Sequence, residues 1–230
     1  RRRGYPRYYQ HNFHYQSDGW FSRRSARLYD HQVEVLFAGG ADAMRRLALP
    51  PLRRALAGRP QQEARLLDLG CGTGRFLSFA KDSWPRLPAI GLDLSPAYLA
   101  EAARSLAPWR GWQLLQAPAE AVPLADGSLD AVTAIFLFHE LPRGVRAAVL
   151  AEARRLLRPG GRLILVDSLQ RGDRPDYDPL LALFPLAFHE PYYADYLEQD
   201  LAAPAAERGL RLVESDCAYL AKLLVFERTP

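Results

Sequence analysis

The 230-residue chain is poor in cysteine, which excludes several classes of protein. Its two cysteines, Cys71 and Cys217, lie far apart, so they form neither a disulfide framework nor a zinc site of the usual spacing. A reducing, cytoplasmic compartment is therefore the expected location.

Long apolar runs are missing as well. No stretch of about 18 or more apolar residues occurs, so no membrane-spanning helix is expected. The opening arginines are followed by tyrosines and histidines, and not by the apolar run of a signal peptide. Because the sequence begins with Arg1 and not with methionine, earlier removal of an organelle-targeting segment stays open.

Lysine is also scarce, since Lys81 and Lys222 are the only two and nearly all basic residues are arginine. The formal net charge is +4, and residues 1–3 are all arginine. Such a charge fits a nucleic-acid partner, but a solvated basic tail explains it better. Because 49% of the residues are hydrophobic, the chain can bury the core of one large domain.

Residues 1–58 are expected to form a helical N-terminal cap that begins with an aromatic segment. Ser22 is placed to cap a helix, because an apolar side with helical spacing follows it. A second, short helix around Met44 is expected to stop at Pro50 and Pro51. The aromatic residues of the segment are Tyr5, Tyr8, Tyr9, Phe13, Tyr15, Trp20 and Phe21.

Residues 59–230 are expected to form the main domain. Between Glu63 and Asp167, short apolar runs alternate with amphipathic helices, the pattern of a parallel sheet with helical connections. Residues 168–205 are rich in proline and aromatics and are interpreted as an irregular or helical insertion. The five expected strands are Arg65–Leu69, Ala89–Asp93, Trp112–Gln116, Ala131–Phe136 and Arg162–Val166.

Two more strands are expected near the end of the sequence, at Leu210–Glu214 and Ala218–Glu227. Residues 215–217 between them allow only a short turn, so this pair should be antiparallel. The predicted fold is therefore α/β, with a doubly wound, mostly parallel, seven-stranded sheet, an antiparallel last strand and the helical cap.

A glycine-rich segment is the strongest functional signal. Residues 66–75 read Leu-Leu-Asp-Leu-Gly-Cys-Gly-Thr-Gly-Arg and stand between an expected strand and an expected helix. Glycine permits backbone angles that are closed to other residues, and it lets a ligand lie directly on the chain. In such sheets, ligands bind at the carboxyl ends of the strands.

This segment matches neither of the common phosphate-binding loops. The dinucleotide fingerprint Gly-x-Gly-x-x-Gly fails because Arg75 or Leu77 stands at its last position, and no Gly-Lys-Ser/Thr follows. Asp68, just before the loop, suits a cationic ligand with an amino group and would repel a pyrophosphate. Asp93 follows at about 20 residues, the spacing of an acid that accepts hydrogen bonds from ribose hydroxyls.

Four successive segments resemble the motifs of the class I S-adenosylmethionine-dependent methyltransferases. The nearest branch is the type 11 group, which includes the ubiquinone and menaquinone biosynthesis enzymes. The resemblance covers about Glu63 to Asp167 and implies S-adenosylmethionine as cofactor, with S-adenosylhomocysteine as product. The four segments are Leu67–Phe76, Ile90–Pro96, Ala119–Asp130 and Leu157–Leu163.

The resemblance also implies roles for single residues. The family commonly has an acid just before Ala119, where Pro118 stands here, which leaves adenine recognition to backbone groups or to Glu120. Tyr29, on the first long helix, is a further candidate for reaching the cofactor. The implied cofactor-binding residues are Asp68, Gly70, Cys71 and Gly72 at the methionine part, Gly74 at a close helix contact, Asp93 at the ribose, Leu94, Ala119 and Glu120 around the adenine, and Phe136 near the sulfonium.

His139 is the candidate catalytic base. It follows the fourth expected strand, close to the expected position of the methyl group, and the adjacent Glu140 could raise its basicity. A base is needed only if the acceptor holds a proton at neutral pH. A structural role for His139, packing or capping at the loop, is an equal alternative.

The methyl acceptor is expected to bind between the N-terminal cap and the insertion, because these segments usually build the acceptor pocket in this family. The aromatic rings there could instead only bury the cap against the core. No metal-ligand spacing occurs, although magnesium-assisted transfer to oxygen stays open. The candidate acceptor-binding residues are His14, Tyr15, Trp20, His189, Tyr192 and Tyr193.

Methyl transfer to a small, hydrophobic or aromatic metabolite is the favoured function. A nucleic-acid methyltransferase is a weaker alternative, because no Asn/Asp-Pro-Pro-Tyr/Phe motif follows the fourth strand and neither cysteine is placed as a nucleophile. A non-catalytic S-adenosylmethionine-binding protein is the third possibility. The acceptor atom and the oligomeric state do not follow from the sequence.

Overall fold

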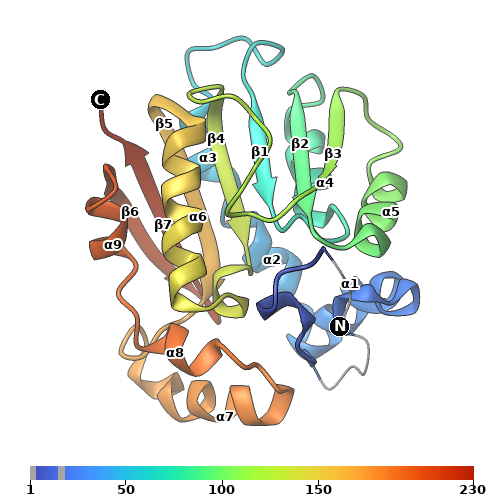
Figure 1. Cartoon of the computed structure of the whole chain (residues 1–230), viewed down its shortest axis with the longest axis vertical. Helices are drawn as coiled ribbons and strands as arrows, with labels where there is room; N and C mark the ends of the chain where they lie inside the picture. Colours follow the sequence, from blue (N-terminus) through green and yellow to red (C-terminus); the bar gives the residue numbers. More distant parts are fainter. Residues whose placement is uncertain (1–3, 15–18) are drawn as a thin grey trace.

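The computed structural model describes residues 4–14 and 19–230, and these form a central sheet with helices on both faces (Figure 1). The strands lie in the order β3-β2-β1-β4-β5-β7-β6. Strands β1 to β5 are parallel, and β7 pairs antiparallel with both β5 and β6. Their bounds are β1 (Leu66–Leu69), β2 (Ala89–Asp93), β3 (Trp112–Gln116), β4 (Leu129–Ile135), β5 (Leu157–Ser168), β6 (Leu210–Ala218) and β7 (Ala221–Arg228).

This topology confirms the predicted fold class, a mostly parallel seven-stranded sheet with an antiparallel last strand. The sequence pattern does not predict that β7 lies between β5 and β6. Residues 223–226 of β7 are all buried, as an interior strand covered on both faces requires. Strand β6 at the edge is mostly exposed and carries polar side chains, which protect a free sheet edge.

The predicted turn at residues 215–217 is wrong. These residues continue β6, where they pair with Leu224, Leu223 and Lys222 of β7, and the chain reverses at Tyr219 and Leu220. Their polar character signals an edge strand and not a turn, because one side of an edge strand faces water.

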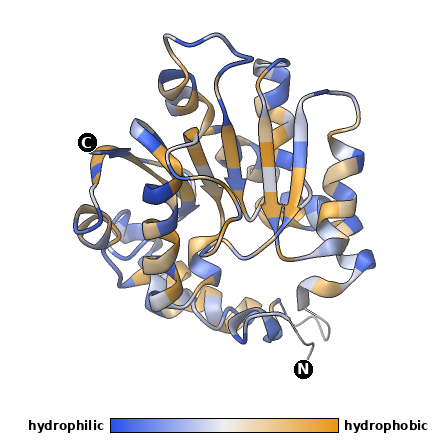
Figure 2. Cartoon of the chain, turned by 45° about the horizontal axis from the view of Figure 1, so that its top comes forward, coloured by the Kyte–Doolittle hydropathy of each residue, from blue (hydrophilic) through white to orange (hydrophobic). Residues whose placement is uncertain are grey.

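A hydrophobic cluster lies on each face of the sheet, because successive strand residues point to opposite faces. In β5, Leu163 and Leu165 belong to one cluster, whereas Ile164 and Val166 belong to the other. Figure 2 shows the hydrophobic stretches along the strands. The alternation explains why short apolar runs were enough to locate the strands in the sequence.

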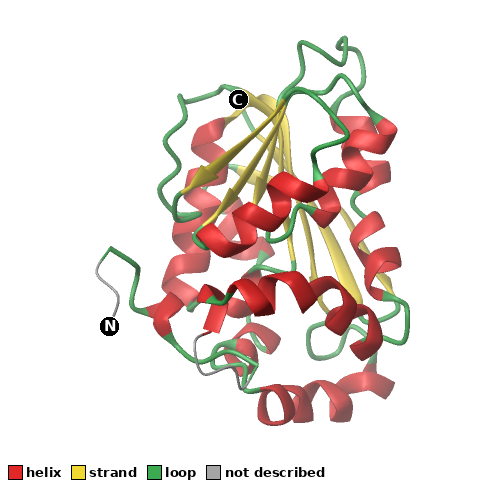
Figure 3. Cartoon of the chain, turned by 90° about the vertical axis from the view of Figure 1, so that its right-hand side faces the viewer, coloured by secondary structure: helices red, strands yellow, loops and turns green. Residues whose placement is uncertain are grey.

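Helices cover both faces of the sheet (Figure 3). Helices α6 and α9 contribute to one hydrophobic cluster, and α2, α3 and α4 contribute to the other. The α-helices are α1 (Arg23–Leu36), α2 (Ala41–Arg46), α3 (Leu49–Ala55), α4 (Arg75–Ser83), α5 (Pro96–Ser105), α6 (Arg143–Leu156), α7 (Asp178–Phe188), α8 (Tyr193–Leu197) and α9 (Ala202–Ala206). The 3-10 helices are η1 (Tyr8–Gln10), η2 (Gly19–Phe21), η3 (Phe138–Glu140) and η4 (Pro175–Tyr177).

Two helices begin with the predicted serine caps. The Ser22 hydroxyl accepts a hydrogen bond from the Ser25 N–H (3.2 Å) at α1, and Ser95 accepts one from the Tyr98 N–H (3.3 Å) at α5. The predicted helix stop at Pro50 is wrong. That proline lies in the first turn of α3, where no intrahelical hydrogen bond needs its missing N–H.

The proposed division at residue 58 stays a prediction. Met44 of α2 and Leu52 of α3 pack in the same hydrophobic cluster as Leu66 and Ile164 of the sheet. The aromatic segment, α1 and the helices α7 and α8 of the insertion lie beyond the carboxyl ends of the parallel strands, at the bottom of Figure 1. Among the described residues, no helix combines the length and the apolar character needed to cross a bilayer.

Replacing Gly74 with alanine should destabilise the fold. Gly74 has a φ of +74°, and a Cβ there would lie 3.2 Å from the Cα and Cβ of Ala102 in α5. We expect Gly74→Ala to lower the free energy of unfolding by about 2 kcal/mol, through backbone strain and crowding between α4 and α5. Gly144→Ala is the control, because nothing lies within 4 Å of its added Cβ. Equal urea midpoints for both variants would contradict this account.

Candidate functional site

A pocket opens between the carboxyl ends of β1, β2 and β4 and the aromatic segment. The loop from β1 to α4 forms its floor, and Gly70 and Gly72 line it. Gly72 has a φ of +53°, and a Cβ there would meet nothing closer than a Tyr98 ring carbon at 3.9 Å. Bare backbone therefore faces the pocket at this point, as close approach of a ligand requires.

Asp93, at the end of β2, holds the loop in place. Its Oδ2 accepts a hydrogen bond from the Gly72 N–H (2.9 Å), and its Oδ1 accepts one from the Ser95 N–H (2.7 Å). Burial raises the pKa of Asp93 to about 6, although these backbone hydrogen bonds oppose the shift. One carboxylate thus joins β2, the glycine loop and the start of α5.

Asp68 lies beside it in β1 and is 1% exposed. Burial raises the pKa of Asp68 to about 7, although the hydrogen bond from the Thr133 hydroxyl (2.7 Å) lowers it. Within the described ranges, neither Asp68 nor Asp93 forms an ion pair with arginine, lysine or histidine. One buried and one half-buried carboxyl group without an ion-pair partner suit a ligand that brings its own positive charge.

Aromatic rings form the opposite wall. The rings of Trp20, Tyr29 and Tyr98 contact one another edge to face, with centroids 5.4–5.7 Å apart. In the described part of the chain, the buried Trp20 Nε1 and Tyr98 Oη have no hydrogen-bond partner. Because buried polar groups are normally satisfied, these two atoms fit a polar ligand in the pocket. S-adenosylmethionine, with a cationic sulfonium and many polar atoms, meets these requirements.

A buried arginine of α2 also lines the pocket. Arg45 of α2 is 5% exposed and lines the pocket, 3.0 Å from an oxygen of Asp42 and 3.8 Å from one of Asp30. Asp30 also accepts a hydrogen bond from the Thr73 hydroxyl (2.9 Å). A guanidinium has five donors, so Arg45 can still bind a ligand carboxylate.

The structure brings most of the predicted cofactor residues together around this pocket, and their binding roles stay predictions. Gly74 lies behind the loop against α5, and the Glu120 carboxylate accepts a hydrogen bond from the Tyr8 hydroxyl (2.8 Å). Neither of them lines the pocket. The predicted residues that do are Tyr29, Asp68, Gly70, Cys71, Gly72, Asp93, Leu94, Ala119 and Phe136, and also Trp20, which was expected to bind the acceptor.

The other candidates for acceptor binding lie away from the pocket lining. Tyr15 falls outside the described residues. Tyr193 is buried, and its hydroxyl forms a hydrogen bond with Ser168 (2.5 Å). His14, His189 and Tyr192 do not line the pocket either. Their roles in acceptor binding stay predictions.

Several pocket residues were missed by the sequence reasoning. Five of them come from the aromatic segment and the first two helices, which were assigned to the cap or to the acceptor, and the other ten lie in or next to the glycine loop, the strand ends and α5. No local pattern distinguishes the first five, because their places depend on contacts between distant parts of the chain, whereas the other ten could have been found from their closeness to the predicted loop and strand ends. The missed lining residues are Tyr8, Tyr9, Phe13, Asp30, Arg45, Thr73, Arg75, Phe76, Leu92, Tyr98, Ala117, Ile135, Leu137, Glu140 and Leu141.

His139 lies in η3, just after β4, and is 8% exposed. Its Nδ1 is 2.6 Å from Oδ1 of Asp167. Burial lowers the pKa of the imidazole, but the Asp167 carboxylate outweighs burial and the pKa is raised to about 9. A histidine that is protonated at neutral pH does not accept a proton, so this environment does not favour the predicted base role.

Comparisons with known proteins place this geometry in a family. Residues 66–161 match the family model of a methyltransferase domain. The chain is 40% identical over 105 residues to a demethylmenaquinone methyltransferase of Thermus thermophilus, covering 45% of this chain and 46% of that protein. It is 41% identical over 101 residues to a malonyl-[acyl-carrier protein] O-methyltransferase of Methylococcus capsulatus, covering 44% and 36%. The chain thus spans less than half the length of these two relatives.

A longer match comes from a demethylmenaquinone methyltransferase of Beutenbergia cavernae, which is 32% identical over 188 residues, 76% of this chain and 71% of that protein. Among solved structures, a Haloferax volcanii methyltransferase in complex with the Trm112 methyltransferase activator has the same fold. It aligns with a TM-score of 0.65 at 18% identity, over 90% of this chain and 97% of that one. The chain therefore belongs to the class I S-adenosylmethionine-dependent methyltransferases of the type 11 group, and its cofactor is S-adenosylmethionine.

Cofactor binding should strengthen as the pH rises. The raised pKa of Asp68 keeps this group neutral up to about pH 7, whereas the cationic cofactor favours its carboxylate. Below pH 7, binding must displace the proton, so we expect affinity to fall by up to about tenfold per pH unit. Calorimetric titration with S-adenosylmethionine between pH 5.5 and 8.5 measures this.

Thr133→Val tests whether Asp68 causes this pH dependence, because the substitution removes the hydrogen bond that stabilises the Asp68 carboxylate. The pKa of Asp68 should rise, and the midpoint of the affinity profile should move to higher pH. Thr229→Val, whose hydroxyl donates to Gly209 far from the pocket, should leave the profile unchanged. A pH-independent affinity in the unsubstituted protein would show that Asp68 does not interact with the cofactor.

Proposed function

We propose that this chain transfers the methyl group of S-adenosylmethionine to a small, hydrophobic or aromatic metabolite. The observation that carries the proposal is the pair of carboxyl groups of Asp68, which is buried, and Asp93, which is half-buried, neither of them in an ion pair, opposite a wall of aromatic rings. The relatives support the reaction class, while their names point to different acceptors: a demethylmenaquinone and a malonyl-acyl carrier protein.

The chain's own residues would bind and orient the cofactor. Asp68 would hold the amino group, Arg45 the carboxylate and Asp93 the ribose hydroxyls. Phe136 has a φ of +55° at the end of β4 and would approach the sulfonium. When bound, S-adenosylmethionine supplies an electrophilic methyl group on sulfur. The protein then has to align the acceptor in line with that bond and exclude water.

The aromatic segment supports the second of these tasks. Phe13 and Trp20 are 2% and 7% exposed and pack with Tyr98 into a cluster above the pocket. The Ser95 hydroxyl donates a hydrogen bond to the Trp20 carbonyl (2.5 Å), which fastens this segment to the start of α5. The segment therefore shields the cofactor side of the site from bulk water.

Calorimetric titration with S-adenosylmethionine and S-adenosylhomocysteine, with NAD as control, tests the cofactor assignment first. We expect micromolar binding of the first two and none of NAD. Labelled methyl transfer is then measured to menadiol, a soluble hydroquinone, to malonyl-coenzyme A and to transfer RNA. Transfer to RNA alone would favour the nucleic-acid alternative, and binding without transfer to any acceptor would favour a non-catalytic protein. Absence of cofactor binding would overturn the proposal.

Arg45 gives a sharper prediction about cofactor orientation. We expect Arg45→Ala to weaken S-adenosylmethionine binding by about tenfold to a hundredfold, because a charge-assisted hydrogen bond to the carboxylate is lost. Binding of decarboxylated S-adenosylmethionine should change little. Arg53→Ala, an exposed arginine of the neighbouring α3, is the matched control. Equal losses for both ligands would show that Arg45 acts only on the structure of the pocket.

A further inference from the structure

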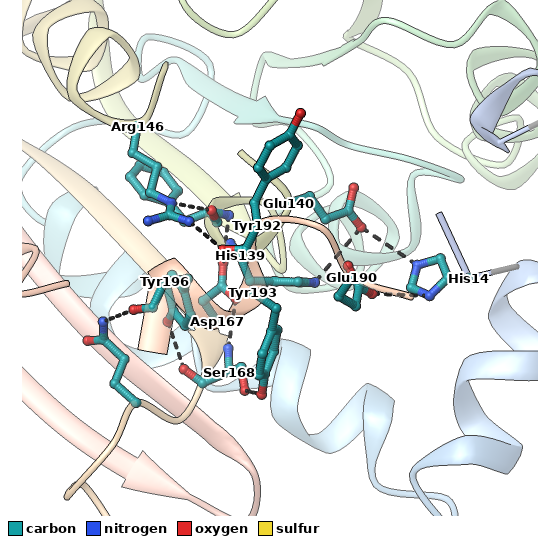
Figure 4. Close-up of polar contacts among 12 residues, drawn as sticks. His14, His139, Glu140, Arg146, Asp167, Ser168, Glu190, Tyr192, Tyr193 and Tyr196 are labelled. Atoms are coloured by element: carbon teal, nitrogen blue, oxygen red, sulfur yellow. Dashed lines mark hydrogen bonds and ion pairs between the residues drawn. The ribbon is translucent and has the colours of Figure 1, made fainter. Parts of the chain in front are cut away.

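Five buried or half-buried side chains form a chain of alternating carboxylates and imidazoles beside the pocket (Figure 4). His139 lies between Asp167 and Glu140, with its Nδ1 2.6 Å from Asp167 Oδ1 and its Nε2 3.9 Å from Glu140 Oε1. His14 lies between the two glutamates, with its Nε2 3.9 Å from Glu140 Oε1 and its Nδ1 3.1 Å from Glu190 Oε1. The order is therefore Asp167, His139, Glu140, His14 and Glu190, here called the carboxylate–imidazole relay.

The members of the relay come from four separate parts of the chain. His139 and Glu140 belong to η3, Asp167 to β5, His14 to the aromatic segment and Glu190 to the insertion after α7. The side chains of Asp167 and Glu190 are 4% and 0% exposed. Charged groups are costly to bury unless they are paired, so such a convergence requires an explanation beyond packing.

Glu140 connects the relay to the pocket. It is the middle member, and it lines the pocket, whereas the other four members do not. It also follows β4 directly, and in this kind of sheet ligands bind beyond the carboxyl ends of the strands. A molecule bound in the pocket therefore meets the relay through the Glu140 carboxylate.

The relay contains one more acid than base. With three ionised carboxylates and two protonated imidazoles, one negative charge stays uncompensated. In the described part of the chain, neither oxygen of Glu190 accepts a hydrogen bond. Burial raises the pKa of Glu190 to about 7, although the two histidines lower it. The relay therefore has room for one additional proton near neutral pH.

Other ionisable groups near the relay do not fill that place. Tyr29 and Tyr193 interact with the charge of Glu190, but burial raises the pKa of both phenols, so they stay neutral. The Tyr193 hydroxyl forms a hydrogen bond with Ser168 (2.5 Å). Arg146 lies behind η3, where it donates hydrogen bonds to the Phe138 carbonyl (2.8 Å) and to Asp195 (2.8 Å).

We propose that the relay accepts the proton of a methyl acceptor whose nucleophilic atom carries a weakly acidic hydrogen, with Glu140 as the residue that receives it. This inference rests on the proposed function. An electron pair of the acceptor forms the new bond to the methyl carbon, and the carbon–sulfur bond breaks with its pair remaining on sulfur. The acceptor proton moves to Glu140, which neutralises the uncompensated negative charge of the relay.

His139 has a positioning role in this scheme. It stays protonated between Asp167 and Glu140, so it stabilises the Glu140 carboxylate and does not itself take the proton. The scheme also selects a class of acceptor. A hydroquinone or phenol holds its hydroxyl proton at neutral pH and needs a proton acceptor, whereas a carboxylate oxygen has no proton to lose.

The first experiment needs no acceptor. Calorimetry in buffers of different ionisation heat gives the number of protons exchanged when S-adenosylmethionine or S-adenosylhomocysteine binds at pH 7. The two ligands share the amino acid part that meets Asp68, but only the first carries a sulfonium charge near Glu140. We expect S-adenosylmethionine to release more protons than S-adenosylhomocysteine, because its charge favours the ionised relay.

Two variants connect this difference to the relay. Glu190→Gln should abolish the difference in proton release. Glu140→Gln should abolish it too, and should also lower the ratio of the affinities for S-adenosylmethionine and S-adenosylhomocysteine by about tenfold, the effect of one lost charge interaction. Glu207→Gln, an exposed glutamate of the C-terminal half, is the control and should behave as the unsubstituted protein. Glu190→Asp, which keeps a carboxylate at this position, should keep the difference in proton release between the two ligands.

The second experiment separates acceptors by their protons. Glu140→Gln should slow methyl transfer to menadiol by at least about a hundredfold, while any transfer to malonyl-coenzyme A is largely spared. Equal proton release for both cofactor forms, with both bound, would overturn the relay and leave the proposed function standing. Equal losses with both acceptors would assign Glu140 a structural role. Failure to bind either cofactor form would instead overturn the proposed function.

Discussion

The carboxylate of Asp93 is the interaction on which the site depends, because it fixes the shape of the glycine loop. It accepts backbone hydrogen bonds from both Gly72 and Ser95, while the Cys71 N–H donates to the Leu92 carbonyl (2.9 Å). The loop is thereby held against β2. Removing the Asp93 carboxylate from water is unfavourable, and a cationic ligand offsets this desolvation better than a neutral one.

The parts of the structure that follow from local sequence are those whose causes are local. The bounds predicted for the second and third strands, Ala89–Asp93 and Trp112–Gln116, agree with the structure, because each is a short apolar run that follows a helix. The serine caps and the glycine loop depend on a few neighbouring residues and were located for the same reason. The first turn of α3 was misread because proline stops a helix in its interior yet favours its beginning.

The remaining parts depend on contacts between distant residues. Arg45 reaches the pocket only because α2 packs beside α4, and Tyr8 meets Glu120 although 112 residues separate them. The aromatic segment was expected at the acceptor, but Trp20 packs on Tyr98 and Tyr29 at the cofactor pocket. Composition identifies such a segment as one that must be buried, whereas the surface that it covers depends on the whole fold.

Electrostatics connects these elements into one site. Asp68, Asp93 and Glu140 face the pocket as acids, and Arg45 contributes a cation at one end, where Asp42 and Asp30 already approach it. An environment that is rich in buried carboxyl groups stabilises a positive ligand more than a neutral one. Transfer of a methyl cation equivalent removes the charge from sulfur, so the same carboxylates should hold the product less strongly than the reactant. These acids therefore stabilise the bound cofactor most strongly before the transfer, while sulfur is charged. After the transfer their stabilising effect on the neutral product is weaker.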